Sequence, residues 1–362
     1  GFLMRTIFRN EADEGFFRNN GYVVFDLLTE QAVEDIWSFY REEFQGPRSV
    51  YPFARSLPYY ISIFDEDIAH KKKVDALLSA HALGKAEELL VDYEVFYSNF
   101  MIKFPGDGQI EAHQDFNFVD ESEHAAFNLW CPLVDTSGRN GGLFVIPGSH
   151  EVFRTQRGPN LPKALTEYNE LLQRYATLIP LKKGQAIIFD HKLVHYSPPN
   201  ATDAVRVAIQ AVLKPKEAPA LHYAYDELSK QVHAYRIDKE YILEGNLWEN
   251  RIEKLTRDHS EELIPFPDRS EIIDALLKLR LRRVRDAIQS APPRPMFRQA
   301  EIQNSFTQKG YVKLPLLDVD EVRRLREIFA EMIGEEVENT DYGMYISLEE
   351  EDPALKALIV EK

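Results

Sequence analysis

The chain has one cysteine, fewer basic than acidic side chains, and no long apolar run. A lone cysteine, Cys131, cannot form an internal disulfide, and it gives none of the paired-cysteine spacings that bind zinc, so we expect a reducing compartment. The 43 Lys and Arg against 59 Asp and Glu give a net charge of −16, which repels phosphate backbones and anionic membranes. No stretch reaches the roughly 18 apolar residues that span a bilayer. We therefore expect a soluble, cytoplasmic protein that binds neither nucleic acid nor membrane.

The middle of the chain has the texture of a β protein. From 93 to 214, short runs of Val, Ile, Phe and Tyr alternate with turn residues, a spacing typical of a sandwich or small barrel. The expected strands are 94–104, 110–116, 125–134, 142–147, 177–182, 185–190 and 204–213. We predict a mainly β protein with flanking helices (α+β), built on a jelly roll, the double-stranded β-helix of cupins.

Helix-forming sequence surrounds this core. Residues 11–45 predict a helix, a short strand and a helix, and 222–290 predict C-terminal helices. Residues 151–176 form a connection longer than most loops, which is typical of a lid. The APPRP at 291–295 cannot continue a helix and reads as a linker. We expect a first domain over 1–290 and a second over 296–362.

The segment after the linker repeats the start of the chain. NNGYVVFDLLTEQAV and QKGYVKLPLLDVDEV align at a constant offset of 289 residues, and the YIS at 60–62 recurs at 345–347. Internal repeats indicate duplicated structural units, so 296–362 is predicted to be the truncated start of a second domain, without a metal site. It is expected to pack on the first domain or to support a homo-oligomer. The alternative is a chance likeness of two strand-then-helix openings.

Two short motifs carry candidate chemistry. His113 and Asp115 follow a predicted strand, where a period of two places both side chains on one face. A single His-x-Asp is weak, and a surface turn explains it equally well. In the second motif a buried strand precedes His195, and Arg206 follows eleven residues later in an otherwise apolar strand. Such an arginine requires an anionic partner, because an unpaired buried charge costs several kcal/mol, and its planar fork suits a carboxylate.

Taken together, these motifs resemble the phytanoyl-CoA dioxygenase family of iron(II)- and 2-oxoglutarate-dependent oxygenases. The resemblance covers about residues 10–215 and rests on three features in the family's order: the HQD at 113–115, the segment at 128–150 with its NGG turn and PGSH end, and His195-x-Ser197 followed by Arg206. The three together are far more specific than any one of them.

The resemblance implies a metal site and a cosubstrate site. His113, Asp115 and His195 would bind iron(II) and leave three positions open for 2-oxoglutarate and O2. Arg206 would pair with the distal carboxylate of 2-oxoglutarate, and Ser197 would donate a hydrogen bond beside it. Relatives that halogenate have a small residue at the Asp115 position, so the carboxylate here favours hydroxylation of a C–H bond with release of succinate and CO2.

Further positions follow from the same resemblance. Asn99 is expected to bind the C1 carboxylate, Lys103 to share its wall, and Trp130 to pack near the cosubstrate, although a core position also explains a buried tryptophan. His191, four residues before His195, is rejected as a ligand because its surroundings predict strand and turn.

The substrate is left open by the sequence. Phe116, Phe118 and the lid charges Arg154, Arg157 and Lys163 suit an acidic or carrier-linked small molecule, but solvated lid charges explain them as well. The resemblance implies an amino acid, an acyl group or a natural-product intermediate, and the sequence does not choose among them. Two other functions compete with the hydroxylase: a non-catalytic jelly-roll module for binding or assembly, and a cupin-type metalloenzyme that does not use 2-oxoglutarate.

Overall fold

The computed structural model describes residues 5–44, 59–245, 251–290 and 299–313, together with 318–320, 322–324 and 326–327. The chain separates into two compact units, 1–286 and 287–362, each considered by itself. The predicted linker at 291–295 and the YIS at 345–347 lie outside the described residues.

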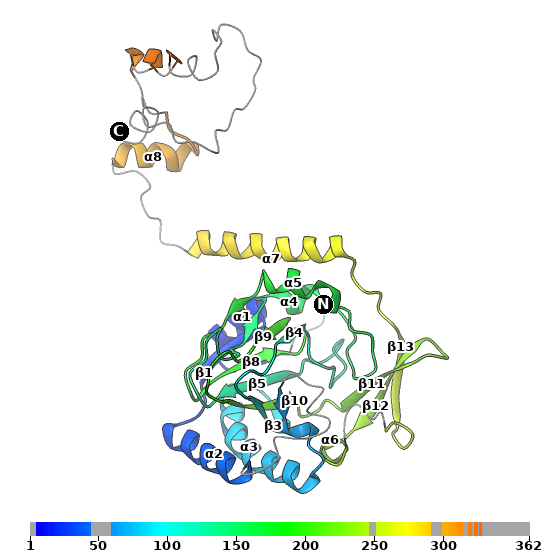
Figure 1. Cartoon of the computed structure of the whole chain (residues 1–362). Helices are drawn as coiled ribbons and strands as arrows, with labels where there is room; N and C mark the ends of the chain where they lie inside the picture. Colours follow the sequence, from blue (N-terminus) through cyan, green and yellow to red (C-terminus); the bar gives the residue numbers. More distant parts are fainter. Residues whose placement is uncertain are drawn as a thin grey trace. The chain divides into compact units, whose positions relative to one another are not determined.

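The longer helices lie toward the two ends of the chain, and most of the strands lie between them (Figure 1). The helices are α1 (Glu11–Asn20), α2 (Glu30–Glu43), η3 (Ser62–Phe64), α3 (Ile68–Leu89), α4 (Ser149–Val152), η4 (Thr166–Tyr168), α5 (Asn169–Gln173), α6 (Lys239–Leu243), α7 (Arg269–Ser290) and α8 (Ala300–Lys309). The strands are β1 (Tyr22–Asp26), β2 (Tyr60–Ile61), β3 (Tyr93–Lys103), β4 (Ile110–His113), β5 (Phe127–Pro132), β6 (Phe144–Val145), β7 (Thr177–Leu178), β8 (Gln185–Asp190), β9 (His195–Ser197), β10 (Arg206–Pro215), β11 (Ala220–Asp226), β12 (Gln231–Ile237) and β13 (Arg257–Glu262).

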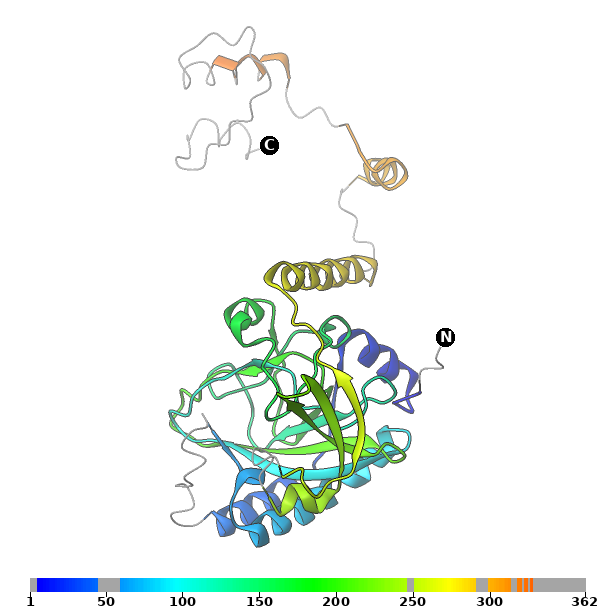
Figure 2. The same cartoon turned by 90° about the vertical axis from the view of Figure 1, so that its right-hand side faces the viewer.

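The largest sheet is the base of the first unit. Its six antiparallel strands follow the order β1-β8-β5-β10-β3-β2. One face packs against the N-terminal helices, and Figures 1 and 2 show α2 and α3 together beneath it. The contact is a continuous apolar cluster that includes Phe17, Ile36, Leu78, Phe100 and Leu129. The apolar faces of these helices are therefore what closes this side of the sheet.

A second antiparallel sheet covers the other face. Its four short strands follow the order β4-β9-β6-β7, and Val145 of β6 meets Trp130, Ile187 and Ala208 of the first sheet in a buried cluster. Two antiparallel sheets packed face to face with flanking helices are the architecture of a jelly roll. The predicted fold is confirmed, and every predicted strand is present, while the three-residue β9 was not anticipated.

The prediction of helices throughout 222–290 is wrong for its first half. Strands β11, β12 and β13 form a third antiparallel sheet there, and α6 and α7 are the helices among the described residues of this segment. Leu221 and Tyr223 of β11 pack on Val232 and Ala234 of β12, so the apolar residues recur every second position, which is a strand period. The turn between β11 and β12 ends at Lys230, whose backbone is in the left-handed region with φ of 58°.

The junction of α1 and β1 depends on a glycine. Asn10 caps the helix by accepting from the backbone N–H groups of Ala12 and Asp13, and Gly21 ends it with φ of 80°. A Cβ at Gly21 would lie 2.6 Å from Nδ1 of His150. Both the left-handed backbone and the close approach of His150 therefore require glycine here.

The second unit repeats this first helix. Helix α8 begins and ends 289 residues after α1, and Gly310, with φ of 74°, ends it as Gly21 ends α1. Residues 311–313 form no strand, and the rest of the predicted repeat lies largely outside the described residues. The predicted tandem domain therefore stays a prediction, supported by one matching helix and its cap.

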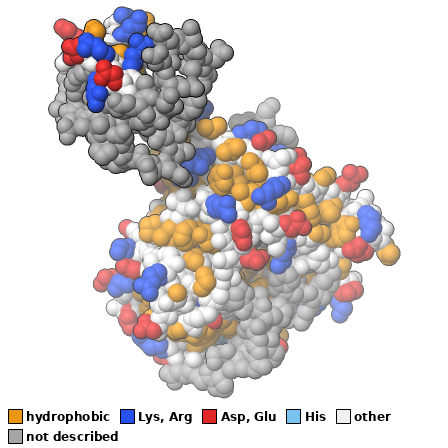
Figure 3. All heavy atoms as spheres, turned by 45° about the horizontal axis from the view of Figure 1, so that its top comes forward, with side chains coloured by type: hydrophobic (Ala, Val, Ile, Leu, Met, Phe, Trp, Pro, Cys, Tyr) orange, Lys and Arg blue, Asp and Glu red, His pale blue; other side chains and the backbone are white. Residues whose placement is uncertain are grey.

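The surface carries charges of both signs. Figure 3 shows acidic and basic side chains interspersed over the face that it draws, with apolar side chains between them. The net charge of −16 is therefore not gathered into one acidic field on this face. Among the described helices, none is both long and apolar enough to cross a membrane.

Substitution of Phe17 tests the packing of α1. The ring is 2% exposed and lies 5.1 Å from Phe8 and 5.0 Å from Phe127, centroid to centroid. Phe17→Ala is expected to lower the free energy of unfolding by about 3–5 kcal/mol because it empties a packed site. The neighbouring Phe16→Ala, at a side chain 47% exposed, is the control and should cost less than about 1 kcal/mol. Equal losses in urea denaturation would contradict this packing.

Candidate functional site

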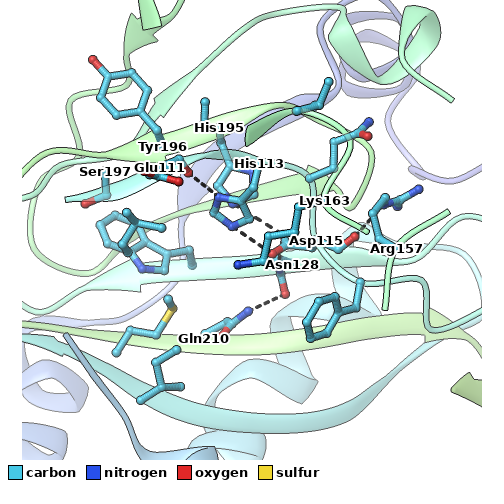
Figure 4. A pocket seen from close by; sticks show the side chains of 18 of the residues that line it. Glu111, His113, Asp115, Asn128, Arg157, Lys163, His195, Tyr196, Ser197 and Gln210 are labelled. Atoms are coloured by element: carbon cyan, nitrogen blue, oxygen red, sulfur yellow. Dashed lines mark hydrogen bonds and ion pairs between the residues drawn. The ribbon is translucent and has the colours of Figure 1, made fainter. Parts of the chain in front are cut away.

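A cavity of about 510 Å³ lies between the two facing sheets and the lid. Its size is typical of a site for a small ligand. The six predicted site residues that line it are His113, Asp115, Trp130, His195, Ser197 and Arg206. The sheets bring these together from segments almost a hundred residues apart, and Figure 4 shows the cavity from close by.

The pairing of two short strands places the histidines. β4 and β9 run antiparallel with His113 opposite His195, and their ring centroids lie 4.3 Å apart. Asp115 follows β4 and faces both rings: its Oδ1 is 3.7 Å from Nε2 of His113, and its Oδ2 is 3.6 Å from Nε2 of His195. One donor atom from each residue lies within 4.8 Å of the others. Two imidazoles and one carboxylate are the donor set of non-haem iron(II) sites with open positions.

Backbone hydrogen bonds fix the tautomer of both histidines. Nδ1 of His113 lies 2.7 Å from the carbonyl oxygen of Glu111, and Nδ1 of His195 lies 2.8 Å from that of Leu193. A carbonyl oxygen can only accept, so each Nδ1 carries a proton, and the lone pair of each neutral ring is on Nε2, the atom available to a metal ion. The side chains therefore fit a divalent metal ion without rearrangement of either ring.

The three groups shift one another's pKa in the apo state. Burial raises the pKa of Asp115, but attraction to His195 and His113 outweighs it and the pKa is lowered. Burial lowers the pKa of His195 to about 4. For His113, hydrogen bonding and attraction to Asp115 outweigh the effect of burial, and the pKa is raised. At neutral pH the carboxylate is thus ionised and His195 is neutral, as metal ligation requires.

A chain of two amides holds the carboxylate. Nδ2 of Asn128 donates to Oδ2 of Asp115 at 2.5 Å, and Nε2 of Gln210 donates to Oδ1 of Asn128 at 2.8 Å. The chain runs from β10 through β5 to the candidate ligand. Such outer hydrogen bonds orient a metal-binding carboxylate.

Arg206 is a buried cation without an acidic partner. It is 2% exposed, donates to the backbone oxygen of Met101 at 3.0 Å, and lies 5.4 Å from the ring centroid of Trp130. Its Nε has no partner, and no described carboxylate is within ion-pair distance. Burial lowers the pKa of Arg206 to about 10, so the group is charged at neutral pH. An anionic ligand in the cavity would offset the cost of burying this charge.

The wall around Arg206 holds one expected residue and one unexpected one. Ser197 lines the cavity, and its Oγ donates to the backbone oxygen of Gly141 at 2.8 Å. Tyr59, the residue before β2, lines the cavity near Arg206, and burial together with the charge of Asp115 raises its pKa. Tyr59 directly precedes the repeated YIS at 60–62, but that repeat carries no chemical signal, so Tyr59 was not among the predicted site residues.

Asn99 and Lys103 are not on the cavity wall, contrary to expectation. Nδ2 of Asn99 donates to the backbone oxygen of Phe100 at 3.2 Å. Nζ of Lys103 donates to the backbone oxygens of Ser197, at 3.2 Å, and Pro198, at 2.5 Å. The donor groups of both side chains thus bind main-chain oxygens, while Oδ1 of Asn99 is buried without a partner, and neither residue belongs to the cavity lining.

His191 lies beside the site without joining its donor group. Its Nδ1 is 3.1 Å from the backbone oxygen of Phe116, and its Nε2 is buried without a partner. Its backbone oxygen accepts from the N–H of Asp115 at 2.9 Å. The three-residue metal group found among the described residues does not include it.

The lid is fastened to the segment that carries Asp115. Arg157 makes a bidentate ion pair with Glu121 at 2.6 and 2.8 Å, and its Nε donates to the backbone oxygen of Asp115 at 2.7 Å. Thr155 donates to the side chain of Gln114 at 2.6 Å. The charge of Arg157 is therefore already neutralised, and this lid residue fixes the loop rather than offering a free cation.

Gln210 shows what sequence reasoning missed. It is a polar residue in the middle of the apolar run VAIQAV, the same kind of signal that singled out Arg206 four positions earlier. Its hydrogen-bond partner, Asn128, lies on a different strand. The amide chain was therefore visible only after β5 and β10 were paired.

The comparison with protein families agrees with this geometry. The family model for phytanoyl-CoA dioxygenase (PhyH) matches residues 17–208, more than half of the chain. The chain belongs to the phytanoyl-CoA dioxygenase family. The match contains all six of the cavity residues predicted from sequence and ends within β10.

Individual relatives of the family match over shorter stretches. A phytanoyl-CoA dioxygenase of Arabidopsis thaliana is 33% identical over 147 residues, 40% of this chain and 50% of that protein. The phytanoyl-CoA dioxygenase domain-containing protein 1 of Danio rerio is 32% identical over 126 residues, 32% of this chain and 43% of that protein. The chain thus spans about half the length of the curated relatives it matches. The crystal structure of a non-haem α-ketoglutarate-dependent epimerase, SnoN, is similar over 72% of this chain and 96% of that chain, with 17% identity and a TM-score of 0.45.

A comparison of two buried histidines tests the donor group. His195→Ala is expected to weaken cobalt(II) binding at least about 100-fold, because loss of a direct ligand costs more than loss of an outer hydrogen bond. His191→Gln should change the affinity less than threefold or so, because Nε2 of His191 is not among the donors. Titration calorimetry measures both. Equal losses would place the metal elsewhere.

The buried Lys103 predicts a pH dependence of stability. Burial and the neighbouring Arg206 lower its pKa from 10.5 to about 7, so between these values the unfolded chain binds a proton that the folded protein does not. Stability should therefore rise with pH through this window, by up to about 1.4 kcal/mol per pH unit from this group. Between pH 7.5 and 9.5, the free energy of unfolding of Lys103→Met, measured in urea, should rise less steeply with pH than that of the parent. Identical slopes would contradict the lowered pKa.

Proposed function

We propose that the chain is an iron(II)- and 2-oxoglutarate-dependent dioxygenase that hydroxylates a C–H bond of a small molecule. The overall reaction consumes O2 and 2-oxoglutarate. One oxygen atom enters the product as a hydroxyl group, and the other enters succinate as CO2 is released. One observation carries the proposal: a two-histidine, one-carboxylate donor group shares a cavity with a buried arginine that has no acidic partner.

The donor chemistry fits both groups. The Nε2 lone pairs of His113 and His195 and the carboxylate of Asp115 would hold iron(II). Arg206 would bind the distal carboxylate of 2-oxoglutarate, because its fork has the geometry and charge for that group. When bound, iron(II) and 2-oxoglutarate supply the activation of dioxygen.

The chain's own residues position and shield this chemistry. Asn128 and Gln210 hold Asp115 in one orientation, and the backbone oxygens of Glu111 and Leu193 hold the rings. Fixed donors require little rearrangement when a ligand binds. Trp130 stacks beside Arg206 and helps exclude water from the proposed carboxylate site. Asp115 itself supports hydroxylation over halogenation, since its carboxylate fills the position that a halide would need.

The arginine separates this function from its rivals. Arg206→Gln is expected to weaken 2-oxoglutarate binding about 100-fold or more, because removing one partner of a buried charged pair costs at least about 2–3 kcal/mol. Iron(II) binding should be unchanged. The exposed Arg139→Gln is the control and should match the parent. Anaerobic titration with 2-oxoglutarate, followed by the visible absorption of the iron chelate, gives the affinity.

Two results would contradict the proposal. Parent protein that binds iron(II) but not 2-oxoglutarate would favour a metalloenzyme of the cupin type, and protein that binds neither would favour a non-catalytic module. Loss of iron from Arg206→Gln would show that the roles are assigned wrongly. In the presence of O2 and a substrate, the parent should form succinate and CO2, and mass spectrometry should show a product heavier by one oxygen atom.

A further inference from the structure

Seven ionisable side chains of Lys, Arg, His, Asp and Glu line the cavity, and five of them have assigned roles: the three metal donors, Arg157 and Arg206. Glu111 and Lys163 remain. Neither makes an ion pair or a side-chain hydrogen bond with any described residue, and they do not pair with each other. The cavity therefore has one uncommitted anion and one uncommitted cation.

Both charges lie beside the metal group. Glu111 is two residues before His113 on β4, and its backbone oxygen holds the Nδ1 proton of that histidine. The positive charge of Lys163 is one of the influences that lower the pKa of His113 against the larger effect of Asp115. Figure 4 shows Lys163 reaching from the lid over Asp115, with Glu111 on the other side of the His113 ring.

The lid holds Lys163 in this place. Arg157 fastens the lid to Glu121 and to the backbone of Asp115, and the flanking Leu161 and Leu165 are each 5% exposed. The backbone on both sides of Lys163 is thus anchored, while Lys163 itself is exposed and lines the cavity. The ammonium is available to a ligand at little ordering cost to the lid.

Part of the remaining wall is apolar and aromatic. It includes Phe64, Tyr97, Phe116, Phe118 and Val212. A ligand that fills this cavity therefore meets an apolar surface, a free carboxylate and a free ammonium. A zwitterion with an apolar body complements all three, whereas an anion would leave Glu111 facing like charge and a cation would do the same for Lys163.

We propose that the substrate is a zwitterion of the amino-acid type, with its carboxylate bound by Lys163, its ammonium bound by Glu111, and its apolar body on the aromatic wall. This inference rests on the proposed function and narrows its substrate class.

Matched ligands with one charge removed test the proposal. The probes are L-leucine, L-methionine, L-phenylalanine and L-tryptophan, each with its N-acetyl derivative, which lacks the ammonium, and its amide, which lacks the carboxylate. Affinities for the full chain, loaded anaerobically with iron(II) and 2-oxoglutarate, are measured by titration calorimetry. At least one amino acid should bind about ten times more tightly than both of its derivatives, because each derivative lacks one charge-assisted contact.

Variants assign the two charges. Lys163→Gln should weaken binding of that amino acid about tenfold or more and leave its amide unchanged, and Glu111→Gln should weaken the amino acid similarly and leave the N-acetyl form unchanged. The lid variant Arg154→Gln is the control, because Arg154 does not line the cavity, and it should match the parent.

The outcomes distinguish this inference from the proposed function. If 2-oxoglutarate binds but no amino acid does, or if the three forms of each probe bind equally, the zwitterion proposal is overturned and the dioxygenase proposal stands. An unchanged amino-acid affinity in Lys163→Gln also overturns it. If 2-oxoglutarate itself does not bind, the dioxygenase proposal fails first.

Discussion

Two hydrogen bonds from imidazole nitrogen to backbone oxygen control the chemistry of this cavity. Because Nδ1 of His113 and Nδ1 of His195 each donate to a carbonyl two residues earlier in the chain, the lone pair of each neutral ring is on the Nε2 atom that lies near Asp115. The bonds are local, so each ring is oriented by its own strand. The pairing of β4 with β9 then brings the two oriented rings within reach of one carboxylate. A donor group of this kind needs little adjustment to receive a metal.

Strand β10 connects the candidate metal group to the buried arginine. Gln210 on this strand supports Asn128 and, through it, Asp115, while Arg206 lies four residues earlier. The strand is central in its sheet and paired on both sides. The separation of Asp115 and Arg206 is therefore fixed by a rigid element, as the proposed binding of 2-oxoglutarate would require.

The two cations that the lid contributes to the cavity differ in their partners. Arg157 is neutralised by Glu121 and fastens the lid. Sequence alone does not distinguish it from Lys163, another cation six residues later on the same lid. Only the fold shows that Glu121 lies within reach. The same limit applies to Asn99 and Lys103, which alternate toward the cavity in sequence but end in hydrogen bonds to main-chain oxygens.

The sequence by itself predicted the jelly roll and singled out the unusual arginine, because strand periodicity and a lone charge in an apolar strand are local signals, and the family resemblance of its motifs pointed to the candidate metal donors. It also found the repeat of α1, whose helix and glycine cap recur at the same offset. The prediction of helices where β11 to β13 stand was wrong, because the alternation of buried residues in these short strands was overlooked and their pairing is visible only in the folded sheet. Only the tertiary structure decided which polar groups are satisfied, because hydrogen bonds and ion pairs between strands far apart in the chain depend on register, and register is a property of the folded sheet.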